Sequence, residues 1–235
     1  MASSSPCSPG RYINVFKRAL WLAAFLPALV AGCALVPPEA RRALAAPYKP
    51  ANVYLREAAL PPDLRRVAVL PLPLNRDYSS QADGAELLAP VFATELSKRH
   101  LFEVICVTPE QLPAPAGTTG WSADGKLPQN LLQRLHDLTG CDAVIFVNLT
   151  VFQPYPPLST GWKARLVDCT RQQTWWAVDE VFDASNISVV AAAQAYARAE
   201  LNQPNPLLAD SGVLHSPRRF GQYTASAVAS TLPTR

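Results

Sequence analysis

The stretch RRVAVLPLPL, residues 65–74, decides the fold that this chain can adopt. A continuous apolar run, Val67 to Leu70, lies in it between charged residues and prolines. Strands that bury one face alternate apolar and polar side chains, whereas a continuous apolar run is typical of a strand covered on both faces. Such strands belong to parallel sheets, in which helices connect successive strands, so helices are expected further along the chain.

Helix and strand patterns alternate after this first strand. Pro90 lies inside the first helical pattern and predicts either a kink or a helix that starts near Leu87. Pro128 suits the first position of a second helix, and Gly140 suits its end. The predicted elements are a helix within 82–100, a strand at 102–107, a helix from 128 to 140 and a strand at 142–152.

The remaining elements complete a mixed sheet. The order strand, helix, strand, helix, strand implies right-handed crossovers and a parallel core. Residues 161–169 and 174–183 form two further strands, whose connections are too short for a crossover, so they should pair antiparallel. Helices at about 187–202 and 217–231 close the chain. The predicted fold class is α/β, with a mixed sheet of about five strands (β-α-β-α-β-β-β) and two C-terminal helices in one domain, residues 65–235.

The first 32 residues have the plan of a bacterial secretory signal. Three basic residues and no acidic one precede an apolar core, 19–31, that is too short to span a bilayer. The core ends at Val30-Ala31-Gly32-Cys33, which resembles the lipobox of bacterial lipoproteins, in which the cysteine is acylated, for example with palmitate. Residues 1–32 are therefore predicted to be a signal peptide, with Cys33 lipidated. Ala34 after the cysteine predicts the outer membrane, with the domain facing the periplasm.

Residues 33–64 are rich in proline and alanine and show no sustained apolar period. They are predicted to be a tether between the lipid anchor and the domain. Such a segment spans at most about 95 Å as polyproline and about 30 Å on average as a flexible coil.

Charge and motif content exclude several classes of function. Removal of residues 1–32 takes away three of the 21 Lys and Arg residues and none of the 18 Asp and Glu residues, which leaves 18 of each. A chain without net charge or a basic run lacks the electrostatic footprint of nucleic-acid binding. No Cys or His pair has zinc-ligand spacing, and the common hydrolase and nucleotide-binding motifs are missing. No metal, cofactor or catalytic residue is therefore assigned.

Three cysteines, Cys106, Cys141 and Cys169, remain in the predicted domain and are interpreted as buried structural thiols. If residues 142–153 and 161–169 pair as a hairpin, Cys169 falls opposite Ile145, about 13 Å along the strand from Cys141. That separation exceeds the limit of about 7 Å between the Cα atoms of a disulfide. No disulfide is expected.

Four aromatic residues are candidates for contact with a partner: Tyr155, Trp162, Trp175 and Trp176. Adjacent strand residues point to opposite faces, so one of Trp175 and Trp176 is expected in the core. The other either lies under a helix on the far face or marks a partner site. The loop QPYPPLSTGW, residues 153–162, is a further candidate for the contact surface, because its prolines lower the entropy cost of binding.

Four segments between residues 65 and 183 resemble a known envelope module: RRVAVLPL, LSKRHLFEVI, LTGCDAVIFVNLT and LVDCTRQQTWW. In this order they are similar to the periplasmic α/β module shared by the curli-secretion lipoprotein CsgG, the penicillin-binding-protein activator lipoprotein LpoB and the N-terminal domain of TolB. The chain departs from the family pattern at Gln172, where glycine is usual, and at Val147-Asn148, where a small residue is usual. The resemblance implies a non-enzymatic protein that works by contacting other envelope proteins.

The expected function is a lipid-anchored binding or assembly module for envelope proteins, in secretion or cell-wall machinery. A pore would need membrane-crossing strands of about 9–11 alternating residues, and the only insertion, 113–126, is too short and polar. The alternative is an enzyme without a recognisable motif, such as a hydrolase of envelope polymers. The short tether favours a partner in or near the same membrane, where shared anchoring raises the effective concentration. The oligomeric state is left open.

Overall fold

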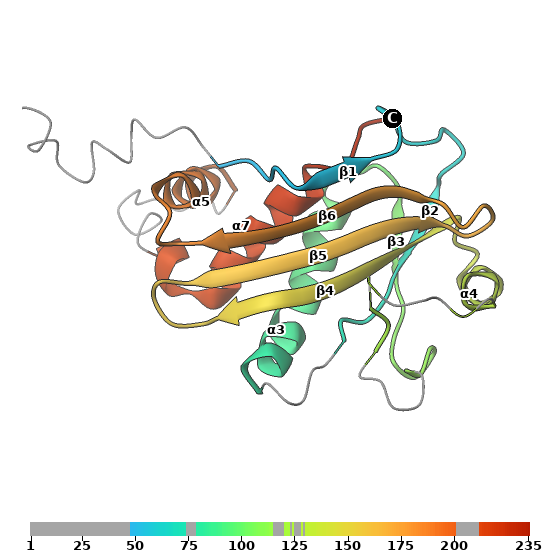
Figure 1. Cartoon of the computed structure of the whole chain (residues 1–235), viewed down its shortest axis with the longest axis horizontal. Coiled ribbons are helices and arrows are strands. Elements are labelled where there is room, and N and C mark those ends of the chain that lie inside the picture. The colour runs from blue at the N-terminus through green and yellow to red at the C-terminus, as the bar shows by residue number, and fades with distance from the viewer. Residues whose placement is uncertain are drawn as a thin grey trace, which may run out of the picture. The chain divides into compact units, whose positions relative to one another are not determined.

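The computed structural model describes residues 48–73, 79–114, 120–122, 124, 128, 130–200 and 212–235. Six strands form one mixed sheet in the order β1-β6-β5-β4-β2-β3 (Figure 1). The strands are β1 (Val53–Leu55), β2 (Arg66–Val69), β3 (Glu103–Cys106), β4 (Ala143–Gln153), β5 (Ser159–Asp168) and β6 (Thr174–Asp183).

The pairing of the strands is the one that the sequence predicts. β2 pairs parallel with β3 and with β4, as expected for strands joined by crossover helices. β4, β5 and β6 form antiparallel pairs, and β1 pairs antiparallel with β6. The α/β class and the mixed sheet are therefore confirmed, with one strand more than predicted, because β1 precedes the predicted domain.

The described helices are α3 (Ser79–Ser97), α4 (Leu131–Thr139), α5 (Ile187–Glu200) and α7 (Pro217–Ala229). Gly140 ends α4 as predicted, in the left-handed conformation, and its N–H donates to the carbonyl of His136. α7 begins with Pro217 after Ser216, whose hydroxyl accepts from the N–H of Arg219. The predicted start of α4 at Pro128 is wrong, because the helix begins at Leu131 after Asn130.

Helix α3 continues through Pro90, so the predicted start near Leu87 is wrong. Proline removes the N–H that would bond to the carbonyl of Glu86. Glu86 and Pro90 both lie on the exposed side of the helix, where water satisfies that carbonyl.

One face of the sheet is covered by α3, α5 and α7, and the largest hydrophobic cluster lies there. Figure 1 shows α3 and α7 behind β4, β5 and β6. Helices α3 and α7 pack closely at Gly221, since a Cβ there would come within 2.3 Å of the Leu88 side chain. The fully buried side chains of this layer include Leu88, Phe92, Trp162, Phe182 and Phe220.

The opposite face of the sheet is covered in part. Leu131, Leu132 and Leu135 of α4 pack over Val144 and Phe146 in a second, smaller cluster. In the described part of the chain, no helix covers this face over β6, β1 and the part of β5 before Val167.

Residues 48–64, which were predicted to belong to the tether, are part of the folded domain, so the predicted domain start at 65 is wrong. β1 completes the edge of the sheet beside β6, and the N–H of Leu60 donates to the carbonyl of Thr234. Leu60 and Leu64 are buried. Isolated apolar residues among prolines give no periodic signal, and only the free edge of β6 makes an extended partner favourable. Residues 33–47, including Cys33, and the predicted signal peptide lie outside the described residues.

No helix that the structure describes is long and apolar enough to cross a membrane.

The register of β4 and β5 brings two cysteines together, contrary to the predicted separation of about 13 Å. Asp168 pairs with Ala143, and the N–H of Cys169 donates to the carbonyl of Asp142 at 3.0 Å. The Sγ atoms of Cys141 and Cys169 are 3.6 Å apart. The prediction assumed a register shifted along the strand, which the hairpin loop and the β-bulge between Leu149 and Val151 correct. Cys106 is exposed rather than buried.

Candidate functional site

The structure buries three of the four aromatic residues that were predicted to contact a partner. Trp162 and Trp176 are 0% exposed and Trp175 is 9% exposed. The indole Nε1 of Trp162 donates to Thr224 Oγ1 at 2.8 Å, and that of Trp176 donates to Thr231 Oγ1 at 2.9 Å. These indoles anchor the C-terminal helical region to the sheet, so the prediction that they contact a partner is wrong.

A β-bulge explains why the two adjacent tryptophans share one core. Leu166 pairs with Trp176 and Val167 pairs with Thr174, which leaves Trp175 as the extra residue of the bulge. A bulge interrupts the alternation of side chains between the two faces. Trp175 and Trp176 consequently both belong to the cluster beneath α3 and α7.

Tyr155 remains exposed, at 77%, in the turn that joins β4 and β5. The side-chain amide of Gln153 donates to the carbonyl of Pro157 at 2.9 Å and so closes the base of this turn. The predicted contact loop therefore presents one aromatic ring, isolated from the tryptophans with which it was grouped.

A larger candidate surface is the part of the sheet that no described helix covers, which we name the open face. It is the side of β1, β6, β5 and the end of β4 that lies opposite α3 and α7, and it faces the viewer in Figure 1. The strand register arranges its side chains in three rows across the strands. The first row is Tyr54, Ala177, Arg165 and Phe146, the second is Asp179, Lys163 and Asn148, and the third is Val181, Gly161 and Val151.

The first row carries an unpaired cation. The guanidinium of Arg165 lies over the ring of Phe146, 5.5 Å from its centroid. Its Nε is buried without a hydrogen-bond partner, and no described carboxylate forms an ion pair with it. Tyr54, at the outer end of the row, is 52% exposed. The row therefore presents the guanidinium of Arg165 as a hydrogen-bond donor, with the exposed ring of Tyr54 on the far side of Ala177.

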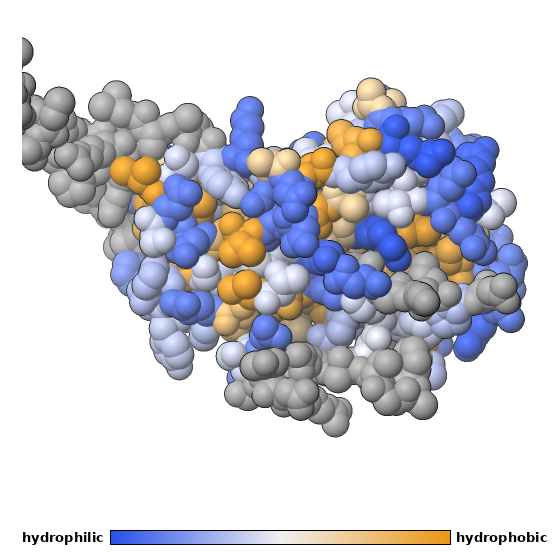
Figure 2. Space-filling model, in the orientation of Figure 1, coloured by the Kyte–Doolittle hydropathy of each residue, from blue (hydrophilic) through white to orange (hydrophobic). Residues whose placement is uncertain are grey.

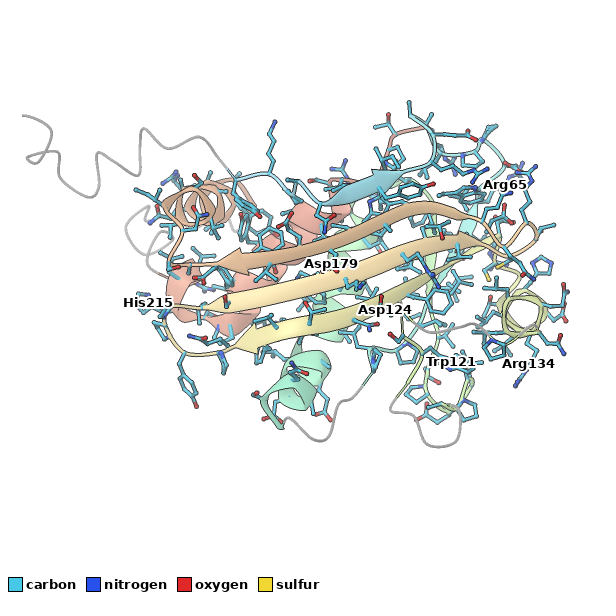
Figure 3. All side chains as sticks on the ribbon, in the orientation of Figure 1. Arg65, Trp121, Asp124, Arg134, Asp179 and His215 are labelled. Carbon is cyan, nitrogen blue, oxygen red and sulfur yellow. The ribbon has the colours of Figure 1, made fainter. Side chains whose placement is uncertain are left out.

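The second row is satisfied internally. Lys163 Nζ lies 2.6 Å from Asp124 Oδ1 and 3.2 Å from Asp179 Oδ2, and these hydrogen bonds raise the pKa of Lys163. Figure 3 shows Asp124 and Asp179 on this face of the sheet. The amide Nδ2 of Asn148 donates to Ser122 Oγ at 2.8 Å, which holds the segment at 121–124 against β4.

The third row consists of small apolar residues. Val181 is 45% exposed. Gly161 lies between Val181 and Val151, and a Cβ at this position would come within 2.4 Å of Thr150 Oγ1, because the bulge in β4 brings the two strands close. Figure 2 shows polar and apolar groups interspersed over this face.

Two hollows lie on the described surface. One, of about 230 Å³, opens on the open face between Tyr54, Lys163, Arg165 and Asp179. The other, of about 380 Å³, is apolar and lies between α3 and the ends of β2 and β3, beside Pro90. The described residues contain no group of three His, Cys, Asp or Glu side chains that could hold a metal ion.

Sequence reasoning missed Tyr54, Arg165 and Val181. The alternation of Ala177, Asp179 and Val181 contains the signal for one common face. Tyr54 joins that face only through the pairing of β1 with β6, which no local pattern announces.

No protein-family model matches this chain, and no curated protein matches it. Among solved structures, the PelC dodecamer protein from Paraburkholderia phytofirmans is similar, with 13% identity and a TM-score of 0.38 over 71% of this chain and 94% of that one. Lipoprotein GNA1162 from Neisseria meningitidis has 20% identity and a TM-score of 0.36 over 50% and 79% of the two chains. TolB from Acinetobacter baumannii has 16% identity and a TM-score of 0.30, over 63% of this chain and 31% of TolB. Membership of the CsgG and LpoB family stays a prediction.

Proposed function

We propose that this chain is a lipid-anchored protein of the bacterial cell envelope that binds another envelope protein through its open face. The observation that carries the proposal is Arg165, which lies over the ring of Phe146, lines the hollow of the open face together with Tyr54 and forms no ion pair with any described carboxylate. Arg165 lines a hollow that opens to solvent, and no described carboxylate neutralises its guanidinium, so a ligand that brings a carboxylate into this hollow is stabilised there.

The three rows define the chemistry of the proposed partner. A carboxylate from the partner pairs with Arg165, whose guanidinium is held in place by the ring of Phe146 and loses little freedom on binding. Small apolar side chains of the partner cover Val151, Gly161 and Val181. Lys163 already has two carboxylate partners, so it adds no second site for an acidic group.

The location of the partner follows from the reach of the chain. Tyr48 is fixed to the domain, since its N–H donates to the carbonyl of Ser188 at 3.2 Å and its hydroxyl to Glu180 Oε1 at 2.6 Å. With Cys33 lipidated, the segment from Cys33 to Tyr48 spans at most about 54 Å when fully extended and about 20 Å on average as a coil. This reach is shorter than the sequence alone predicts, so the partner is anchored in, or close to, the same membrane. By the sequence signal this is the outer membrane.

Photocrosslinking in intact cells tests the proposal. A photoreactive amino acid replaces Tyr54 or Val181 in the full chain, and a matched control carries it at Leu138 of α4, which is 51% exposed and lies off the open face. The two open-face positions should capture one common protein that resides in the same membrane, and Leu138 should not capture it. Arg165→Gln should reduce the capture at Val181 while the circular-dichroism spectrum stays unchanged.

Two outcomes contradict the proposal. Equal capture of the same protein from Leu138 and Val181 would show that the open face has no special role. Capture of inner-membrane proteins alone, from a chain shown to be in the outer membrane, would contradict the predicted location of the partner.

A further inference from the structure

The described residues hold one pair of cysteine side chains in contact. Cys141 follows the Gly140 cap of α4, and Cys169 follows the last residue of β5. Their Sγ atoms are 3.6 Å apart, and the residues are 0% and 6% exposed. The backbone hydrogen bond from Cys169 to Asp142 fixes the two chain segments side by side.

We propose that Cys141 and Cys169 form a disulfide bond in the native protein. An S–S bond measures about 2.05 Å, so the two sulfurs need to approach by roughly 1.5 Å. Small changes in side-chain torsion supply this movement, because both cysteines lie at the ends of regular elements and not within them. The bond covalently closes the whole β4–β5 hairpin.

A shared metal ion is the other chemistry that a close thiol pair suggests, and the surroundings argue against it. Zinc takes four ligands in structural sites. Among the described residues, no third or fourth His, Cys, Asp or Glu side chain is placed to complete such a set. His136, the imidazole near Cys141, has its Nδ1 2.8 Å from the carbonyl oxygen of Cys141 and so donates there. Two thiols are all that a disulfide needs, whereas a structural zinc site would need two further ligands.

The oxidant that the bond requires is a second disulfide, carried by a small thiol or by a thiol–disulfide oxidoreductase. The thiolate of Cys141 attacks one sulfur of that disulfide, forms a mixed disulfide and releases one carrier thiolate, which takes up the proton that Cys141 lost. The thiolate of Cys169 then attacks the Cys141 sulfur and releases the second carrier thiolate, which takes up the proton of Cys169. Two protein thiols are oxidised and one carrier disulfide is reduced to two thiols.

In the folded, reduced protein the pair is polarised, whereas in the unpacked chain either cysteine can make the first attack and the balance of the two steps is the same. The hydrogen bond between the two sulfurs lowers the pKa of Cys141 and raises that of Cys169, and the hydroxyl of Thr139 further lowers the pKa of Cys141. Both sulfurs are buried, so the carrier reaches them before the hairpin packs against α4. The bond should consequently form during folding and only slowly in the folded, reduced protein.

Refolding of the purified full chain tests the proposal, and it does not depend on the proposed location or partner. The chain is reduced, unfolded in urea and refolded with oxidised glutathione, then denatured in acid, alkylated, digested and examined by mass spectrometry. A peptide pair linked through Cys141 and Cys169 should appear, and the exposed Cys106 should not be joined to either of them. Reduction of the refolded chain should lower its Tm by about 5–15 °C.

The bond should persist in Cys106→Ser and be lost in Cys169→Ser. Alkylation of both Cys141 and Cys169 as free thiols in the refolded wild-type chain would overturn the proposal, as would pairing of either of them with Cys106. The wild-type measurement decides the question even where Cys169→Ser folds poorly.

Discussion

Among the described residues, two other than glycine adopt a left-handed backbone conformation, His100 with φ of 51° and Gln172 with φ of 55°. In this region the Cβ of an L-residue approaches the following carbonyl, at a cost of roughly 1–2 kcal/mol. Gln172 lies in the turn between β5 and β6, at the position where the resembled family usually has glycine. Gln172 thus occupies a backbone conformation that favours glycine.

Gln172→Gly should stabilise the protein by about 0.5 kcal/mol, because glycine removes the steric strain but adds freedom to the unfolded chain. Urea unfolding of the full chain measures the change. Gln173→Gly is the control, since Gln173 has no positive φ and should be neutral or destabilising. A loss of stability in Gln172→Gly, equal to that of the control, would contradict the strain argument.

At the scale of elements, the short strand β1 is held by one carboxylate. Glu180 Oε1 accepts from the Tyr48 hydroxyl at 2.6 Å, and Oε2 accepts from the N–H of Ala51 at 2.8 Å and of Asn52 at 3.3 Å. Burial raises the pKa of Glu180, but these donors outweigh it, so the pKa of Glu180 is lowered from 4.5. Burial and the Glu180 carboxylate raise the pKa of Tyr48 to about 12.

Glu180→Gln should lower the free energy of unfolding by about 1–2 kcal/mol at pH 7, through the loss of charge-assisted hydrogen bonds. A lowered carboxyl pKa contributes stability that is present above the unfolded value of 4.5 and is lost as pH falls through the folded pKa. The difference between wild type and variant in the free energy of unfolding, measured in urea, should therefore shrink as pH falls below the unfolded value of 4.5 and on through the lower folded pKa.

Glu57→Gln is the matched control for Glu180→Gln, because Glu57 is an exposed carboxylate close to β1 in the chain. It should leave the stability at pH 7 nearly unchanged, as most exposed substitutions do. A destabilisation by Glu180→Gln that is equal at both ends of the pH range would show that its charge does not hold β1.

At the scale of the whole molecule, the proposed lipid on Cys33 would set, together with the attachment of Tyr48 to the domain, how far the open face lies from the membrane. The interpretation of residues 30–33 as a lipobox predicts that Cys33 carries the lipid. Metabolic labelling with a fatty-acid analogue should mark the wild type and not Cys33→Ser. Equal labelling of the two proteins would contradict the anchor and remove the limit on reach.

The sequence by itself determined the elements and their class. The apolar run at 67–70, the helical spacing around Leu88 and the stop at Gly140 are local signals, and each of them corresponds to an element of the structure. Parallel pairing of β2 with β4 follows from the crossovers that those helices make. These features depend on side chains close together in the chain, which is why composition and periodicity contain them.

The candidate site was decided by tertiary structure alone. The bulge in β6 placed Trp175 and Trp176 in the same core. The bulge in β4 helped to align Cys169 with Asp142. The pairing of β1 with the edge of β6 brought Tyr54 to the open face. A shift of one residue in a strand exchanges its two faces, so contacts across the sheet depend on a register that no single segment specifies. The open face exists because α4 covers only part of the sheet, and this extent of cover is a property of packing between segments distant in the chain.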